Sequence, residues 1–315
     1  MLTVSDTENT NSGAYVSLEA LQQLRYTAKQ CLMRTGKSFA IRGGSHQSRM
    51  VNRGMEFEDV RPYQAGDDIR AIDWRVTART QVTHSKRYSE EKEKPIITVV
   101  DQRRSSFFGS QPCFKSVYSC QLAAIINWAT VASGDRSGGV VLGCDGIHDT
   151  RPARSHKTVN RWLQQLTTAN HKLSATVRDT QTLGDGLQHV MRTTHTGTEI
   201  ILFSDCYDLS EQCEQHLFYL SRRHRMSIVW IVDQLEMALP TMATASISNG
   251  QAVQSLPVSA AIREQFAQQY QQKYDALQAL CQRLGIRFIQ APVQTAPADI
   301  AQALIHRTST STGVM

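Results

Sequence analysis

The pattern of apolar and polar residues divides the chain near residue 95. Before that point, apolar residues recur at helical spacing from Tyr15 to Met33, which predicts an amphipathic helix ending before Gly36. Two later segments, 54–63 and 81–89, alternate apolar and polar residues and predict short strands. Between them, residues 64–75 read as a turn followed by a compact segment, and we expect Ile69, Ile72 and Trp74 to be buried there.

From residue 95 onward, short continuous apolar runs alternate with helical segments. Such runs are typical of parallel strands covered on both faces. The pattern therefore predicts an α/β domain with a doubly wound, mostly parallel sheet at 95–315, preceded by an N-terminal helix and β-rich elaboration at 1–94. Residues 240–257 read as an inserted loop or hairpin. The predicted strands are 96–101, 139–144, 199–205, 226–233 and 286–290, and the predicted helices are 116–132, 157–166, 182–192, 210–222, 259–284 and 298–307.

The composition is that of a globular protein with a substantial core. The chain has 315 residues, of which 41% are apolar and 20% charged, and its mean hydropathy is −0.35. No apolar run approaches the roughly 18 residues of a membrane helix, so we expect no membrane span. The seven cysteines form no C-x-x-C pair, and the N-terminus lacks the pattern of a secretion signal. These features favour reduced cysteines and a cytoplasmic location.

The net charge of +6 is concentrated in one third of the chain. Residues 21–104 hold 17 Lys and Arg against 10 Asp and Glu, whereas the remaining residues hold 17 against 18. Most of these cations have acidic neighbours, which makes nucleic-acid binding an alternative rather than the preferred interpretation. The exception is the basic loop 34–53, through which the nucleic acid would bind in that alternative. It contains five cations and no acid: Arg34, Lys37, Arg42, Arg49 and Arg53.

Two predicted strands of the sheet end in an acid, Asp101 and Asp205. Ligands of doubly wound sheets bind outside the carboxyl ends of the strands, and Thr180 or Thr182 precedes a helix that can reach the same crevice. These oxygens suit Mg²⁺, although strand-end acids also cap helices. A metal-dependent hydrolase using the two acids is therefore an alternative, but no general base or nucleophile accompanies them. P-loop, dinucleotide and nucleophile-elbow signatures are also missing, so we identify no catalytic residues and expect no enzyme.

A dense motif precedes the sheet. It runs Gly54-Met-Glu-Phe, then Val60-Arg-Pro-Tyr-Gln-Ala-Gly-Asp-Asp-Ile-Arg70, Ile72-Asp-Trp74 and Ala78-Arg79, followed by Lys86-Arg-Tyr-Ser-Glu-Glu91. Its interleaved charges suit either a structural role, joining subdomains through paired charges, or a direct contact with a partner. Gly66 suits a turn with positive φ. The motif residues singled out are Arg61, Tyr63, Gly66, Asp67, Asp68, Arg70, Asp73, Trp74 and Arg79.

This motif resembles that of domain-of-unknown-function family fifty-eight. The family is similar to von Willebrand factor A domains and commonly accompanies MoxR-type AAA+ ATPases. The resemblance implies a metal-ion-dependent adhesion site of pattern D-x-S-x-S with a later Thr and Asp. Matched by position, the ligands are Asp101, Ser105, Thr182 or Thr180, and Asp205.

One position of the implied metal site departs from the pattern. Arg103 stands where the first Ser of D-x-S-x-S belongs, and an Arg is a fixed cation that disfavours a neighbouring dication. We therefore expect a degenerate site in which Arg103 pairs with Asp101 or Asp205 in place of a metal, and no cofactor. In the alternative, Arg103 swings out and a weakened Mg²⁺ site survives.

By resemblance, the chain is expected to be a non-enzymatic adaptor. Its partners would be a MoxR-type AAA+ ATPase and a protein client, and other von Willebrand factor A-like proteins could also bind. The crevice formed by Asp101, Arg103, Ser105, Thr182 and Asp205 would face the partner.

Overall fold

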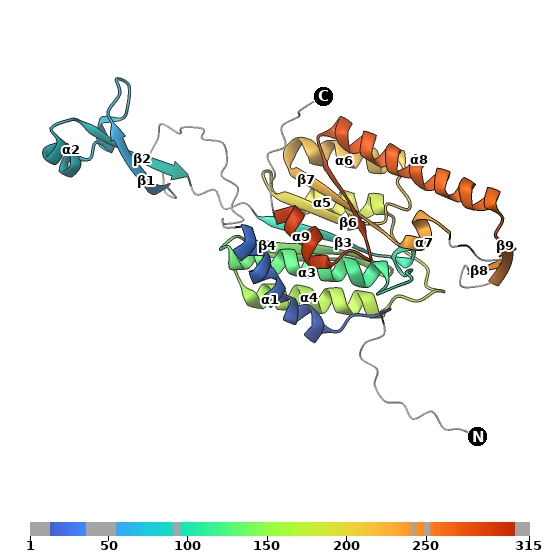
Figure 1. Ribbon diagram of the computed structural model, residues 1–315. Helices are drawn as coiled ribbons and strands as arrows, with labels where there is room; N and C mark the ends of the chain where they lie inside the picture. The colour runs from blue at the N-terminus through green and yellow to red at the C-terminus, as the bar shows by residue number, and fades with distance from the viewer. Residues whose placement is uncertain are drawn as a thin grey trace. The chain divides into compact units, whose positions relative to one another are not determined.

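The computed structural model describes residues 13–35, 55–90, 95–239, 241, 244–248 and 253–305 (Figure 1). The chain divides into two compact units. One comprises residues 1–39 and 94–315, and the other comprises residues 40–93. We call them the α/β unit and the hairpin unit. The N-terminal helix thus belongs to the α/β unit rather than to the β-rich segment that follows it.

A six-stranded sheet forms the centre of the α/β unit, with strand order β10-β7-β6-β3-β4-β5. Neighbouring strands run parallel except for the edge pair β4 and β5, which is antiparallel. β3 is buried along its whole length and rich in β-branched residues, as expected of a central strand covered on both faces. The predicted doubly wound, mostly parallel fold is confirmed. The strands are β3 (Ile96–Gln102), β4 (Ser137–Gly143), β5 (Gly146–Ala153), β6 (Glu199–Ser204), β7 (Arg225–Val232) and β10 (Arg287–Pro292).

Helices cover both faces of this sheet (Figure 1). One face carries α1 (Leu18–Thr35), α3 (Lys115–Ala132), α4 (His156–His171) and α9 (Pro297–Ile305). The other carries α5 (Leu183–Thr193), α6 (Glu211–Arg223) and α8 (Ala260–Leu284). A short helix, α7 (Gln234–Met237), follows β7, and the predicted insertion contains the hairpin of β8 (Thr244–Ser248) and β9 (Val253–Pro257).

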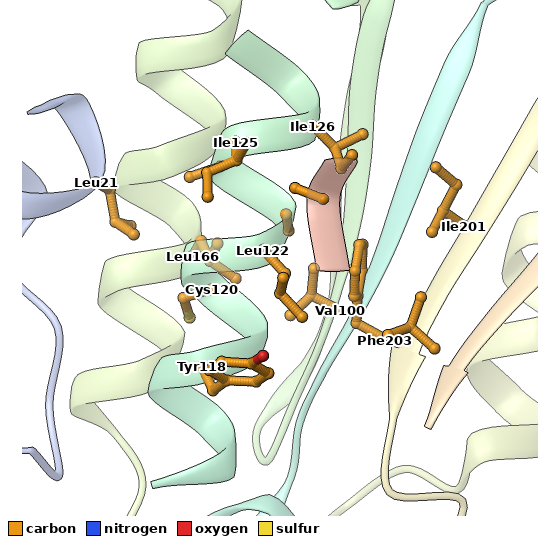
Figure 2. Packing of buried hydrophobic residues seen from close by; sticks show 14 of the residues in the cluster. Leu21, Val100, Tyr118, Cys120, Leu122, Ile125, Ile126, Leu166, Ile201 and Phe203 are labelled. Atoms are coloured by element: carbon orange, nitrogen blue, oxygen red, sulfur yellow. The ribbon is translucent and has the colours of Figure 1, made fainter. Parts of the chain in front are cut away.

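The larger hydrophobic core lies between the sheet and α3. Figure 2 shows Leu122 and Ile126 of α3 facing Val100 of β3 and Phe203 of β6, while Leu21 of α1 approaches α3 from the opposite side. α3 is therefore enclosed by the sheet and by α1, which explains why almost every position of this helix is buried. The N-terminal helix completes this core.

Close packing of α4 on β4 depends on a glycine. A Cβ atom at Gly139 would overlap the indole ring of Trp162, which is fully buried. Because Gly139 has no side chain, the indole of Trp162, the largest side chain of α4, can pack directly against β4.

The hairpin unit has little buried surface among its described residues. β1 (Met55–Pro62) pairs with β2 (His84–Glu90) in antiparallel fashion, and a 3₁₀ turn (Ile69–Ala71) and α2 (Trp74–Thr80) lie between them. The two predicted strands are confirmed. The expected burial of Ile69 and Trp74 is wrong, because their side chains are 67% and 66% exposed, whereas Ile72 is half-buried.

The basic loop 34–53 lies outside the described residues, apart from Arg34 and Thr35 at the end of α1. Within the described ranges, no helix combines the length and apolar character needed to cross a membrane.

Candidate functional site

The predicted site residues gather where β3 and β6 end, beside the first turn of α3. Asp101 lies at the end of β3, Arg103 and Ser105 follow it, and Asp205 directly follows β6. The structure adds two residues that sequence reasoning did not select, Lys115 and Asp208. We call these six residues the strand-end site: Asp101, Arg103, Ser105, Lys115, Asp205 and Asp208.

Arg103 binds two carboxylates through one planar guanidinium. Its Nε and Nη2 donate to Oδ1 and Oδ2 of Asp101 at 2.9 and 2.8 Å. Its Nη1 and Nη2 also donate to Oδ2 and Oδ1 of Asp208, at 2.6 and 2.8 Å. Paired bonds of this kind combine charge with fixed geometry. The expected pairing of Arg103 with Asp101 is therefore present, but the second partner is Asp208 rather than Asp205.

Asp205 has a cation of its own. The Nζ atom of Lys115 donates to Oδ2 of Asp205 at 2.9 Å and to Oε1 of Glu236 at 2.7 Å. Lys115 begins α3 and is almost completely buried. Because the helix macrodipole disfavours a cation at this end, the two carboxylates are what make its position tolerable.

The mutual charges keep both ion pairs ionised despite burial. Burial alone would lower the pKa of Arg103 and Lys115, but the facing carboxylates raise both pKa values above their ordinary range. Burial would likewise raise the pKa of Asp205 and Asp208, yet Lys115 and Arg103 respectively lower them. The strand-end site thus holds fixed charges at neutral pH.

The hydroxyl groups expected at the site occupy different places. The Oγ atom of Ser105 donates to Oδ1 of Asp205 at 3.2 Å, so Ser105 joins the site. Thr182 instead caps α5 together with Asp185, and Thr180 donates to the carbonyl oxygen of Cys144. The hydroxyl that contacts Asp101 is that of Ser204, at 2.7 Å.

The loop between β6 and α6 presents an aromatic side chain beside this site. Cys206 adopts a left-handed backbone conformation with φ of 49°, which is uncommon for a residue with a Cβ atom. The next residue, Tyr207, has a side chain that is 76% exposed, and its backbone N–H donates to Oδ1 of Asp205. The loop therefore carries an exposed tyrosine that stands in the chain between the two site residues Asp205 and Asp208.

The donor set does not fit the divalent cation that the resemblance implies. Both oxygens of Asp101 accept bonds from Arg103, and the oxygens of Asp205 accept from Ser105, Tyr207 and Lys115. Two buried cations already neutralise the carboxylates that would have to bind the metal. A dication would therefore have to displace a guanidinium or an ammonium group from its hydrogen bonds.

The motif residues of the hairpin unit pair locally. Arg61 donates to Asp67 at 2.7 Å, and Gly66 between Tyr63 and Asp67 has φ of 104°, as the turn prediction required. The remaining acids cap short helices: Asp68 accepts from the backbone N–H of Arg70, and Asp73 accepts from those of Arg75 and Val76.

Sequence reasoning found part of the strand-end site but missed Lys115, Asp208, Ser204 and Glu236. One signal was available for Lys115, since a lysine in the first turn of an otherwise apolar helix requires a nearby acid. The other three contacts join segments roughly a hundred residues apart, or more, in sequence, and only the folded sheet brings them together.

Relatives of the chain exist among mycobacterial proteins. "Uncharacterized protein Rv1480" of Mycobacterium tuberculosis is 27% identical over 252 residues, which cover 79% of this chain and 76% of that protein. "Uncharacterized protein Mb1516" of Mycobacterium bovis matches to the same extent.

Among solved structures, the SpRpn10 VWA domain is similar at 12% identity with a TM-score of 0.39, covering 70% of this chain and 98% of that one. An aerotolerance-related membrane protein from Bacteroides fragilis, with multiple mutations to serines, is similar at 13% identity with a TM-score of 0.38, covering 67% and 96%. A von Willebrand factor type A protein from Catenulispora acidiphila is similar at 11% identity with a TM-score of 0.34, covering 71% and 44%.

The dense motif and the sheet that follows it fall within one family's sequence profile. That profile matches residues 59–276, from the last part of β1 into α8. Because the match covers more than half of the chain, the protein belongs to the family described as "Protein of unknown function DUF58".

Proposed function

We propose that the chain is a non-enzymatic adaptor that acts with a MoxR-type AAA+ ATPase in assembling or remodelling a protein complex, and that the strand-end site faces the partner. The observation that supports this most is the pairing of Asp101 and Asp205 with the buried cations Arg103 and Lys115. These paired bonds give the buried part of the site a fixed arrangement of charged groups beneath its exposed rim. The ATPase partnership rests on the family resemblance.

The rim of the strand-end site has the side chains that a recognition surface uses. Tyr207 is 76% exposed, and Asp208 and Glu236 are each partly exposed beside the buried charges. Tyrosine is enriched among residues that dominate binding energy, and carboxylates at a rim steer the partner's approach. The buried cations would hold these rim groups in place.

The test is an affinity capture of the full chain from its native cells, with ATP and without it. We expect a AAA+ ATPase to be recovered with the unaltered chain and largely lost with Tyr207→Ala, which changes an exposed side chain and leaves both ion pairs intact. Tyr219→Ala is the matched control, since Tyr219 on α6 is also exposed, at 56%. Recovery of no AAA+ ATPase, or equal recovery with both variants, would count against the proposal.

A further inference from the structure

A second surface lies on α2 of the hairpin unit. Trp74, Arg75, Ala78 and Arg79 are all exposed, and their spacing places them on one face of this seven-residue helix. The opposite face, with Val76 and Thr77, is half-buried. Trp74 is 66% exposed. Such exposure is unusual, because covering an indole removes a large apolar surface from water.

Local hydrogen bonds hold this face outward. The Asp73 carboxylate caps α2 through the backbone N–H groups of Arg75 and Val76. On the inner side, the Oγ1 atom of Thr77 accepts from the backbone N–H of His84 on β2, at 3.0 Å. Because the inner face is tied to β2, the helix cannot turn Trp74 inward without breaking these bonds.

The surface is also positively charged. The acids of this segment have local partners: Asp67 pairs with Arg61, Asp68 accepts from a backbone N–H group, and Asp73 accepts from backbone N–H groups and lies 3.8 Å from Lys86. Arg75 and Arg79 on the exposed face form no ion pair with any carboxylate of the described residues, and neither does Arg70 in the preceding 3₁₀ turn. The helix itself thus carries two guanidinium groups and no carboxylate beside Trp74, and the nearest acid is Asp73 at its N-terminus, which attracts Arg75.

Aliphatic side chains near the helix indicate which kind of partner fits. Ile69 precedes α2 and is 67% exposed, and Val82 follows it and is 52% exposed. Aliphatic groups offer little to a phosphate backbone or to stacked bases, but they pack well against apolar side chains of a protein.

We propose that the exposed face of α2, formed by Trp74, Arg75 and Arg79, is a docking surface for an acidic protein segment that also carries apolar residues. The indole and the neighbouring aliphatic side chains would cover the apolar residues, while the guanidinium groups pair with Asp or Glu of the segment. This surface contains no residue of the strand-end site, so the inference goes beyond the proposed function and stands independently of it.

The experiment measures fluorescence anisotropy of labelled probes titrated with the full chain at low salt. The probes are a peptide built of Glu and Leu, a peptide built of Lys and Leu, and a single-stranded oligonucleotide of thymidines. We expect the Glu/Leu peptide to bind best, and its affinity to fall with added salt. Trp74→Ala, and Arg75→Glu combined with Arg79→Glu, should each weaken it by about tenfold or more, as expected of central interface residues.

The matched control lies on α1, where Arg25 and Tyr26 form another exposed arginine and aromatic pair, with Tyr26 at 71% exposure. Arg25→Glu combined with Tyr26→Ala should leave binding of the Glu/Leu peptide unchanged. Tyr207→Ala should do the same, which separates this surface from the strand-end site. Thermal melting of each variant checks that it remains folded.

Three results would overturn the proposal. The first is an unaltered chain that does not bind the Glu/Leu peptide, and the second is equal binding by the Trp74 variant and the α1 control. The third is preferential binding of the oligonucleotide that is lost with Trp74→Ala, which would make α2 a nucleic-acid surface instead.

Discussion

Arg103 serves two carboxylates from two different strand ends, and this dual pairing sets the chemistry of the strand-end site. Asp101 lies two residues before Arg103 in the chain, whereas Asp208 comes from the loop after β6. The guanidinium thus ties two segments together at the point where the resemblance implies a metal ion. Removing it would leave two carboxylates facing each other without a cation.

The first prediction follows from this geometry and is tested by calorimetric titration with Mg²⁺ and Mn²⁺. We expect no saturable binding to the unaltered chain. Arg103→Ser removes the guanidinium and restores the D-x-S-x-S pattern, so this variant should bind Mg²⁺ and its melting temperature should rise when Mg²⁺ is added. Arg103→Lys keeps a cation and should not bind. Tight binding to the unaltered chain that Asp101→Ala abolishes would contradict the metal-free interpretation.

The second prediction concerns the buried pair of Lys115 and Asp205. The pKa of Asp205 is lowered in the folded chain from its ordinary value of 3.8, so ionised Asp205 contributes stability above that pH and loses it as the pH falls through the folded-state pKa. Lys115→Met leaves the carboxylate buried without its cation. We expect this change to lower the free energy of unfolding at neutral pH by about 3–5 kcal/mol and to weaken its dependence on acid.

An exposed ion pair supplies the control for this experiment. Lys172 and Asp145 lie 2.6 Å apart but are both largely exposed to solvent. Lys172→Met should change the free energy of unfolding by about 1 kcal/mol or less. Chemical denaturation between acidic and neutral pH measures both variants, and equal losses would show that burial does not govern the Lys115 pair.

At the scale of single residues, sequence reasoning identified groups that precede or follow strands but not their distant partners. Asp101, Arg103 and Asp205 were identifiable because strand ends converge in a parallel sheet. The position of Thr182 was misleading because the same sequence feature, a hydroxyl before a helix, serves as a cap for α5. Which of these roles applies depends on contacts that span the fold.

Among the elements, β5 is the one strand of the main sheet that the apolar pattern did not predict. Its sequence, Gly146-Ile-His-Asp-Thr-Arg-Pro-Ala153, has no continuous apolar run, because this edge strand is only partly buried. Charged residues and a proline at an edge also discourage pairing with other chains. The central strands were predictable for the opposite reason, since both of their faces are buried.

The third prediction tests the contact between α4 and β4. Gly139→Ala would place a methyl group within the ring of Trp162, so α4 must shift outward. We expect the free energy of unfolding to fall by about 1–3 kcal/mol, the usual cost of overpacking. The measurement is unfolding by denaturant, monitored by circular dichroism.

A second glycine provides the comparison for this variant. At Gly184 in α5, a Cβ would lie 3.5 Å from the Oγ1 atom of Thr182, an ordinary contact. Gly184→Ala should therefore be neutral or slightly stabilising, since alanine favours helices. Combining Gly139→Ala with Trp162→Phe should recover part of the loss. Equal effects of the two glycine variants would exclude steric overlap as the cause.

For the whole molecule, the division into units follows buried surface rather than chain order. The sequence shows that α1 has an apolar stripe, but it does not show which part of the fold covers that stripe. Leu21, Ala28 and Cys31 complete the core around α3, and so draw the N-terminal helix into the α/β unit. The hairpin unit is inserted between α1 and β3.

The charge excess also looks different in the folded molecule. Within residues 60–86, Asp68 and Asp73 accept from backbone N–H groups and Asp67 pairs with Arg61, whereas Arg75 and Arg79 are exposed. Opposite charges that are neighbours in the sequence therefore need not form ion pairs in the folded chain.

The buried ammonium and guanidinium groups give the strand-end site a property that an ion-loaded site lacks. Because Lys115 and Arg103 are part of the chain, the charge beside Tyr207 stays constant when divalent ions are scarce or chelated. If the site faces a partner as proposed, that surface would be complete as soon as the chain folds, and its binding strength would depend neither on the metal supply of the cell nor on competition from other metal-binding proteins.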